Sequence, residues 1–425
     1  MNKNCYRNLG ILLFIICFSV SVQAQQIFIA NLSGAQQVPP LDSVTRAVCT
    51  LRFNQPQTQG ELNCRYVNLY FGNETTVRIH GNASVGEEGP VIVSFPITVF
   101  NQVGQFTKSF TVTSEQFAEI NANRNYIVLQ QSPTAGIRGQ FHVANGTYND
   151  FDGDGRTDLT VYRNSNNAFY TQSSLTGELL SQPIGQPGDS VSLTVDFDGD
   201  GKSDFSTARY NAQVLWRIVK STTRTVQETL WGSSTLGDFF AAADYDGDAA
   251  ADIAVFRAGV WYIIESSTGN FRADYFGQSG DVPAASDYDR DGRADLAVAR
   301  SENGVRVWYV RKSSDDQFYR VEWGLSSDAF FAGRADWDGD GAADISVIRN
   351  ESGQRVFYIR RSSDNQLQVI RWGASSDLPK LGDYDGDGKT DAAVTRTVNN
   401  LKVFLILQSS TGQPRYEYFG LPGDF

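Results

Sequence analysis

The segment at residues 150–158 reads D-F-D-G-D-G-R-T-D, and five variants of it follow along the chain. The variants are D-F-D-G-D-G-K-S-D (196–204), D-Y-D-G-D-A-A-A-D (244–252), D-Y-D-R-D-G-R-A-D (287–295), D-W-D-G-D-G-A-A-D (336–344) and D-Y-D-G-D-G-K-T-D (383–391). Successive copies start 43 to 49 residues apart, a period typical of solenoids, propellers and arrays. The last two-thirds of the 425-residue sequence is therefore a repeat array.

The order of residues in each copy suits a hard divalent cation. Carboxylates at positions 1, 3, 5 and 9 and a main-chain carbonyl at position 7 can surround Ca²⁺, and glycine at position 6 permits the sharp turn. Mg²⁺ is the weaker candidate because it retains more of its own water. One copy could be an ordinary Asp-Gly turn, but six copies at a fixed period disfavour that interpretation. We therefore predict structural Ca²⁺ at about six sites. The predicted ligand residues, in the order of positions 1, 3, 5, 7 and 9, are Asp150, Asp152, Asp154, Arg156, Asp158, Asp196, Asp198, Asp200, Lys202, Asp204, Asp244, Asp246, Asp248, Ala250, Asp252, Asp287, Asp289, Asp291, Arg293, Asp295, Asp336, Asp338, Asp340, Ala342, Asp344, Asp383, Asp385, Asp387, Lys389 and Asp391.

These loops differ from EF-hand loops in their second half. Position 12 is valine in most copies and never the glutamate of an EF-hand. The residues that follow, such as L-T-V and I-A-V, have a period of two and predict a strand instead of a helix. We expect each loop to lie in a β-hairpin. The third loop should hold its ion most weakly, because Ala249 at position 6 costs about 1–2 kcal/mol in a left-handed conformation.

Each unit continues in phase after its loop. A third strand ends in an apolar residue plus Gly, and a turn then ends in Gly-Asp or Ser-Asp. Four strands per unit is the count of a propeller blade. The unit resembles the FG-GAP/VCBS repeat of integrin heads and bacterial surface proteins, and the resemblance covers residues 146–425. The second strands share an aromatic or apolar centre: F-Y (169–170), L-W-R-I (215–218), V-W-Y-I (260–263), V-W-Y-V (307–310), V-F-Y-I (356–359) and V-F-L-I (403–406).

The two ends of the array indicate a closed ring. Residues 141–150 are interpreted as the strand that enters the first loop, and the last unit stops where another such strand would begin. We therefore predict a six-bladed β-propeller. The second-strand aromatics could pack between blades or form a sugar-stacking surface, and their regular period favours packing.

Residues 25–145 predict a β-sandwich, because short alternating strands are separated by Gly, Pro and Asn. The whole chain is thus predicted to be all-β. This segment contains the motifs F-I-A-N-L-S-G-A-Q-Q-V-P-P (28–40), V-R-I-H-G (77–81), G-P-V (89–91) and Y-I-V-L…G-I-R-G-Q-F (126–141). These motifs resemble the CHRD domain, which in chordin binds secreted signalling proteins. His80 and His142 are too few for a copper–zinc site, so we assign them structural roles and no metal.

Residues 1–24 have the features of a secretory signal peptide. Two basic residues precede an apolar run that is too short to span a bilayer, and Ala24 ends it. Export leaves only Cys49 and Cys64, in two alternating segments. Pairing Phe53 with Gly60 places these cysteines directly opposite each other, which predicts a disulfide in an oxidising compartment. Two buried free thiols are the alternative.

The charge of the chain narrows its possible functions. The formal net charge is −12, and the six loops hold 24 of the 48 acidic residues. This balance argues against a nucleic-acid partner, and two histidines exclude most histidine-rich metal enzymes. We therefore attribute the net negative charge of the chain to metal sites whose bound cations the formal charge does not include.

We expect a monomeric, non-catalytic, calcium-stabilised binding or adhesion protein whose ligand is a protein or a polysaccharide. It would be secreted, periplasmic or at the cell surface, with no membrane span once the signal is cleaved. A calcium-dependent lectin, a polysaccharide lyase or hydrolase, and a pure spacer are the alternatives. The repeats contain no His or Cys and no G-x-S-x-G motif, which weighs against an enzyme without excluding carboxylate or Tyr/Arg catalysis.

Overall fold

The computed structural model of the chain describes residues 27–33, 45–53, 58–67, 74–81, 88–98, 103–121, 125–132, 135–143, 148–191, 193–331 and 335–425, and every structural statement below concerns these residues. They form 31 strands and one helix, so the all-β class is confirmed. The signal peptide predicted at residues 1–24 lies outside the described residues. No helix in the described part is long and apolar enough to cross a membrane.

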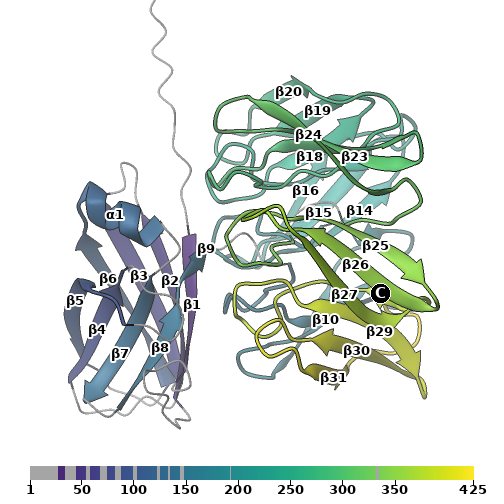
Figure 1. Cartoon of the computed structure of the whole chain (residues 1–425). Coiled ribbons are helices and arrows are strands. Elements are labelled where there is room, and N and C mark those ends of the chain that lie inside the picture. Colours follow the sequence, from purple (N-terminus) through teal and green to yellow (C-terminus); the bar gives the residue numbers. More distant parts are fainter. Residues whose placement is uncertain are drawn as a thin grey trace, which may run out of the picture.

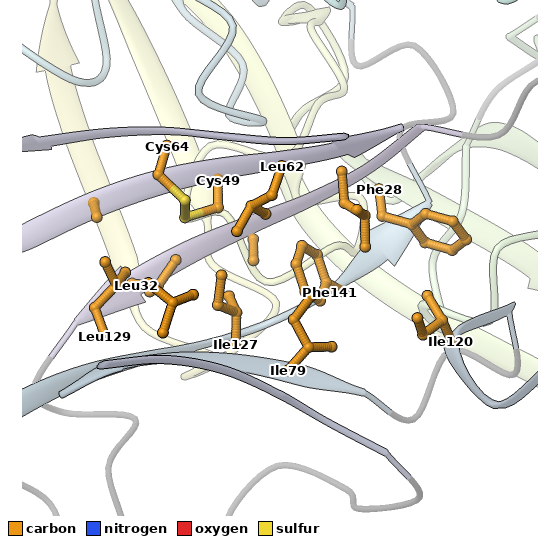
Figure 2. Packing of buried hydrophobic residues seen from close by; sticks show 14 of the residues in the cluster. Phe28, Leu32, Cys49, Leu62, Cys64, Ile79, Ile120, Ile127, Leu129 and Phe141 are labelled. Atoms are coloured by element: carbon orange, nitrogen blue, oxygen red, sulfur yellow. A yellow bond between two sulfur atoms is a disulfide. The ribbon is translucent and has the colours of Figure 1, made fainter. Parts of the chain in front are cut away.

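The N-terminal strands form the sandwich that their alternating sequence predicts. One nine-stranded sheet runs in the order β5-β4-β7-β8-β1-β2-β3-β6, with β9 paired to β1. It folds into two layers around a single apolar core, and Figure 2 shows Leu62 of one layer facing Ile79 and Ile127 of the other. The strands are β1 (Ile27–Ser33), β2 (Arg46–Phe53), β3 (Gln59–Val67), β4 (Glu74–His80), β5 (Val91–Thr98), β6 (Val103–Thr111), β7 (Tyr126–Ser132), β8 (Ala135–Gln140) and β9 (His142–Val143).

The β2–β3 hairpin has the register that its sequence predicts. Phe53 pairs with Gly60, and Cys49 lies opposite Cys64. The two cysteines form a disulfide, and both are fully buried in the sandwich core (Figure 2). The predicted cross-strand bridge is therefore confirmed.

The helix α1 (Ser114–Asn121) was not predicted from the sequence. Thr113 caps it: the Gln116 N–H donates to Thr113 Oγ1 at 3.2 Å, and the Thr113 N–H donates to Gln116 Oε1 at 2.9 Å. This reciprocal pair is a capping box, which the T-S-E-Q sequence encodes. Phe117 and Ile120 of α1 then bury against the sandwich core.

The C-terminal region forms a β-propeller beside the sandwich (Figure 1). Its described strands make six antiparallel sheets of three or four strands each, in chain order. The strands are β10 (Leu159–Arg163), β11 (Ala168–Gln172), β12 (Leu179–Pro183); β13 (Ser190–Val191), β14 (Phe205–Tyr210), β15 (Val214–Val219), β16 (Val226–Leu230); β17 (Phe239–Phe240), β18 (Ile253–Arg257), β19 (Val260–Ile264), β20 (Phe271–Tyr275); β21 (Val282–Pro283), β22 (Leu296–Glu302), β23 (Val305–Arg311), β24 (Phe318–Leu325); β25 (Ile345–Glu351), β26 (Gln354–Arg360), β27 (Leu367–Ala374); and β28 (Leu378–Pro379), β29 (Ala392–Val398), β30 (Leu401–Leu407), β31 (Pro414–Tyr418).

The aromatic residues of the second strands are packing residues. Trp216, Trp261 and Trp308 are at most 1% exposed, and each donates its indole N–H to a main-chain carbonyl of the third strand or the residue after it in the same unit. Third-strand tryptophans bridge units: Trp231 Nε1 donates to the Tyr262 carbonyl at 3.1 Å. Trp216, Trp261 and Trp308 also belong to apolar clusters that include residues of the next unit, so packing between blades, the favoured interpretation, is confirmed for these three residues.

The last sheet joins the first one through residues 421–425. Phe425 and Tyr162 exchange two main-chain hydrogen bonds of 3.0 and 3.2 Å, so Phe425 occupies the strand position beside β10. For residues 142–143, the prediction that residues 141–150 enter the first loop as a strand is wrong, because these two residues form β9, which pairs with β1 of the sandwich. Residues 144–147 lie outside the described residues, and the Asn149 carbonyl accepts the Asp158 N–H of the first loop at 2.9 Å. An apolar alternation as short as residues 141–143 fits either sheet, and the sandwich contact prevails.

The turn that ends in Gly-Asp or Ser-Asp places an aspartate beside an arginine of the next long strand. The Asp238 side chain is 1% exposed, and Arg257 Nη2 donates to it at 2.8 Å. Since each candidate metal loop precedes that strand and the arginine lies toward its far end, loops and ion pairs lie at opposite ends of the strand. The six pairs are Asp424–Arg163, Asp189–Arg209, Asp238–Arg257, Asp281–Arg300, Asp328–Arg349 and Asp377–Arg396.

Candidate metal centres

The first aspartate of each loop organises the turn. In the first loop the Gly153 N–H donates to Asp150 Oδ1 and the Gly155 N–H donates to Asp150 Oδ2, both at 2.7 Å. Both glycines have positive φ, 77° and 81°, a conformation in which a side chain is costly. The same two hydrogen bonds recur in the other five loops.

The predicted carboxylates converge. In the first loop, oxygen atoms of Asp150, Asp152 and Asp158 lie within 4.8 Å of one another, and the second and fifth loops gather the same positions. In the third and fourth loops the group is positions 1, 3 and 5, for example Asp244, Asp246 and Asp248. Two oxygens bound to one Ca²⁺ at about 2.4 Å lie at most about 4.8 Å apart, so this spacing suits a single ion.

One oxygen of the position-3 carboxylate lacks a partner in four loops. Asp198 Oδ1, Asp289 Oδ1, Asp338 Oδ1 and Asp385 Oδ1 are buried and accept no hydrogen bond among the described residues. A buried carboxylate oxygen without a donor is costly, since burial removes its hydration. The residues present therefore fit a bound cation, which would supply the missing positive charge at these atoms.

The pKa values of the loop carboxyl groups are raised, which reflects the same cost of burying carboxylates without a cation. Burial, followed by repulsion from Asp152, raises the pKa of Asp158 to about 8. Burial and repulsion from Asp295 likewise raise the pKa of Asp287 to about 8. The pKa is raised at positions 1 and 9 of all six loops: Asp150, Asp158, Asp196, Asp204, Asp244, Asp252, Asp287, Asp295, Asp336, Asp344, Asp383 and Asp391.

A pair of hydroxyl residues orients the carboxylates, and the sequence analysis missed it. In the sixth unit, Ser409 donates its N–H to Asp391 at 2.6 Å and its hydroxyl to Asp387 at 2.8 Å, while the Ser410 hydroxyl donates to Asp385 at 2.6 Å. Such contacts hold a metal ligand in position. The signal was present, because a Ser-Ser or Ser-Thr pair follows every second strand: residues 173–174, 221–222, 266–267, 313–314, 362–363 and 409–410.

The position-7 residues touch the clusters through their N–H groups. The Arg156 N–H donates to Asp154 Oδ1 at 2.8 Å, and the Lys389 N–H donates to Asp387 Oδ1 at 2.9 Å. The equivalent bond forms at Lys202, Ala250, Arg293 and Ala342. The ligand role of the position-7 carbonyl oxygens stays a prediction.

Neighbouring loops are hydrogen-bonded into a ring. The position-8 N–H of each loop donates to the position-1 carbonyl of the loop before it, for example Ser203 to Asp150 at 2.6 Å. The Thr157 N–H closes the series by donating to the Asp383 carbonyl of the sixth loop at 2.6 Å. The intervening bonds are Ala251 to Asp196, Ala294 to Asp244, Ala343 to Asp287 and Thr390 to Asp336, at 2.6 to 2.7 Å.

Two loops carry a side chain where the backbone favours glycine. Ala249 at position 6 of the third loop has a φ of 70°, the left-handed conformation on which its predicted weakness rests. Arg290 at position 4 of the fourth loop has a φ of 67°, whereas the other five loops have glycine there. That the third loop holds its ion most weakly stays a prediction, and the fourth loop carries a second residue in the left-handed conformation. Arg290 also forms an ion pair with Asp340, a predicted ligand of the fifth loop.

We predict that Ala249→Gly and Arg290→Gly each tighten calcium binding at their own loop by about tenfold, because each removes about 1 kcal/mol or more of backbone strain from the folded loop. Calorimetric calcium titration of each variant measures this change. Gly341→Ala, in the fifth loop, is the matched control and should weaken binding by a similar factor. Equal affinities in all four proteins would contradict the strain argument.

The sandwich contacts two of the candidate metal loops. Arg65 Nη1 donates to the Asp152 carbonyl at 3.0 Å, and Arg52 Nη1 donates to the Gly199 carbonyl at 2.8 Å. A cavity of about 170 Å³ lies between these residues. Both arginines lie on the β2–β3 hairpin, whose strands the Cys49–Cys64 disulfide links. This hairpin therefore contacts the first and second candidate metal loops.

Comparisons with known proteins agree with both sequence resemblances. A family model of the CHRD domain matches residues 28–141, and a model of the FG-GAP-like repeat matches residues 196–255. Among solved structures, the chain is similar to the Dos1 propeller at 8% identity, with a TM-score of 0.34, covering 70% of this chain and 81% of that one. It is also similar to a protein from Lactobacillus plantarum at 10% identity, with a TM-score of 0.35, covering 83% of this chain and 98% of that one. No curated protein matches the chain. The chain thus contains a CHRD domain at residues 28–141 and an FG-GAP-like repeat at residues 196–255.

Proposed function

We propose that the chain is an exported, calcium-stabilised binding or adhesion protein that engages a protein or polysaccharide outside the cell or at its surface. The observation that carries the calcium part is the unpartnered, buried Oδ1 atom within a group of four carboxylates, as at Asp385. Ca²⁺ would be held by the aspartates of each loop, and it would supply the charge that keeps them together. Its role in this proposal is structural.

Three points support export. The Cys49–Cys64 disulfide is of the kind that persists in oxidising compartments. Extracellular fluids also commonly hold calcium at concentrations that fill sites of modest affinity, which suits loops that depend on the ion. The basic and apolar residues before Ala24 have the features of a secretory signal peptide, which agrees with export.

The proposal includes no catalytic activity. The repeats contain no His or Cys, and the aspartates of the loops and of the interunit turns are already committed to clusters or ion pairs. A lectin surface would need aromatic residues other than the second-strand tryptophans, which are buried. The exposed aromatics of the propeller's outer strands are Phe271, Tyr275, Phe318, Tyr416 and Tyr418.

A calcium-switched capture experiment tests this function. The full chain would be immobilised and exposed to a glycan array and to acidic and neutral polysaccharides, first with calcium, then with a chelator, and then with calcium restored. We expect a ligand that is retained in calcium, released by the chelator and recaptured afterwards. Retention of the ligand that does not depend on calcium, or the appearance of cleaved polysaccharide ends, would overturn the proposal.

A further inference from the structure

Lys402 of β30 is a largely buried residue whose ammonium group has no partner among the described residues. Its residue is 4% exposed, and no hydrogen bond or ion pair of its ammonium group occurs among the described residues. The carboxylate that attracts it belongs to Asp424, which Arg163 already binds through Nε and Nη2 at 3.0 and 2.9 Å. Burial accordingly lowers the pKa of Lys402.

The equivalent residues of two other units are satisfied. Lys402 pairs with Thr397 in the β29–β30 hairpin, and Arg306 and Arg355 hold the same register in the fourth and fifth units. Arg306 Nη2 donates to the Asp328 carbonyl at 3.1 Å, and Arg355 donates to the Asp377 carbonyl at 2.8 Å. Each arginine therefore reaches the turn that closes its own unit, whereas the lysine of the sixth unit makes no such bond.

A groove of about 390 Å³ opens beside Lys402. It is lined by Ser376, Asp377, Thr395, Arg396 and Thr397 as well as Lys402, together with Ala374 and Leu378. Two polar atoms of this lining are buried without a partner among the described residues: Thr395 Oγ1 and Arg396 Nε.

The groove carries an excess of positive charge. Asp377 is the acidic residue of its lining, and Arg396 already forms an ion pair with it. Lys402 therefore remains uncompensated. Lys380 adds to the excess, since burial and then repulsion from Lys402 lower the pKa of Lys380 to about 8. The lining that contains Lys402 also holds the hydroxyl groups of Ser376, Thr395 and Thr397, which can donate hydrogen bonds, and this combination suits an oxyanion.

We propose that this groove binds the oxyanion group, carboxylate or sulfate, of an acidic saccharide. Lys402 would supply the charge, and Thr395, Thr397 and Ser376 would donate hydrogen bonds to the anion or to neighbouring sugar hydroxyls. This inference rests on the proposed binding function and names the chemistry of one of its ligands. The groove lies at the end of β29 opposite the candidate metal loop, so an acidic polymer could bind there without contacting the metal centres.

Titration calorimetry on the calcium-loaded full chain tests the proposal, with glucuronate and inorganic sulfate as probes and glucose as the neutral control at constant ionic strength. We expect saturable binding in the millimolar range, with one site, for at least one of the two anions and none for glucose. Lys402→Met should weaken it by about tenfold or more, since a charge-assisted hydrogen bond is lost. Thr395→Val keeps the side-chain shape and should weaken it by about threefold or more while leaving the melting temperature unchanged.

Lys312→Met, on another part of the propeller, is the control for net charge and should bind like the unmodified chain. Binding of glucuronate but not sulfate identifies a carboxylate ligand, and the reverse identifies a sulfate ligand. Equal binding of glucose, or undiminished binding by Lys402→Met, would overturn the inference. If the groove fails this test while calcium-dependent capture of a polymer persists, the proposed function survives and only the location and charge of its ligand are wrong.

Discussion

Removal of calcium is expected to lower the melting temperature of the propeller by about 10 °C or more. A site half-saturated tenfold below the ambient calcium concentration stabilises the fold by about 1.4 kcal/mol, and six sites of that kind would together add about 8 kcal/mol. That sum is comparable to the whole stability of a typical domain. Scanning calorimetry of the chain in calcium, in magnesium and in excess chelator measures the effect. An unchanged melting curve in chelator would reject the calcium proposal.

The stabilisation by calcium should also depend on pH. In the metal-free chain the pKa of Asp158 and of Asp287 is about 8, well above the usual 3.8. The folded state therefore binds more protons than the unfolded state between about pH 4 and pH 8, so metal-free stability should fall as the pH rises through that window. Calcium displaces these protons, and its stabilising effect should grow over the same window. A calcium-induced shift that is the same at pH 5.5 and pH 8 would contradict the assignment.

Asp385→Asn separates a metal site from a merely acidic turn. Burial, followed by repulsion from Asp385, raises the pKa of Asp391 to about 7. The Oδ1 atom of Asp385 has no partner among the described residues. The substitution should stabilise the metal-free chain, because it removes a repelling charge, and destabilise the calcium-loaded chain, because it removes a ligand. Asp364→Asn, at a more exposed site outside the loops, is the matched control and should change neither state by more than about 0.5 kcal/mol. The same sign in both states would favour a turn without an ion.

The local parts of this structure could be predicted from the sequence, because their determinants lie within a few residues of one another. Phe53 opposite Gly60 follows from the turn between two alternating segments, and the disulfide follows from that register. The loop aspartates are visible because their spacing repeats. The fourth-loop defect was visible too, since Arg290 replaces a glycine found in the other five loops.

The parts that could not be predicted depend on contacts between distant segments. Nothing near Arg52 or Arg65 in the sequence indicates that they donate to loop carbonyls about 90 to 150 residues away. The alternation at residues 141–143 suits two sheets equally, and only the three-dimensional arrangement decides that β9 joins β1. The unpartnered state of Lys402 likewise depends on Arg163, which holds Asp424 from the other end of the repeat array.

Deletion of residues 421–425 is expected to be as damaging as calcium removal, because these residues close the ring. The deletion removes both main-chain hydrogen bonds between Phe425 and Tyr162 and the ion pair of Asp424 with Arg163. It also uncovers the edge of β10, and an exposed edge strand promotes association. We expect a melting temperature lower by about 10 °C and formation of dimers or larger aggregates, measured by calorimetry and by size-exclusion chromatography with light scattering.

Asp424→Ala and Asp238→Ala form a matched pair that isolates ring closure from local chemistry. Both aspartates are nearly fully buried, both accept a main-chain N–H, from Leu421 and Ser233 respectively, and both bind an arginine through two nitrogens. Each substitution should therefore cost about 2–3 kcal/mol locally.

The two variants differ in which units they join. Asp238 joins two units that are consecutive in the sequence, whereas Asp424 joins the last unit to the first, which are not consecutive. Asp424→Ala should thus lower the melting temperature further than Asp238→Ala and make β10 more accessible to proteases. Identical behaviour of the two variants would show that the loop ring, through the Thr157–Asp383 hydrogen bond, and the apolar contacts of the first and sixth sheets close the propeller without residues 421–425.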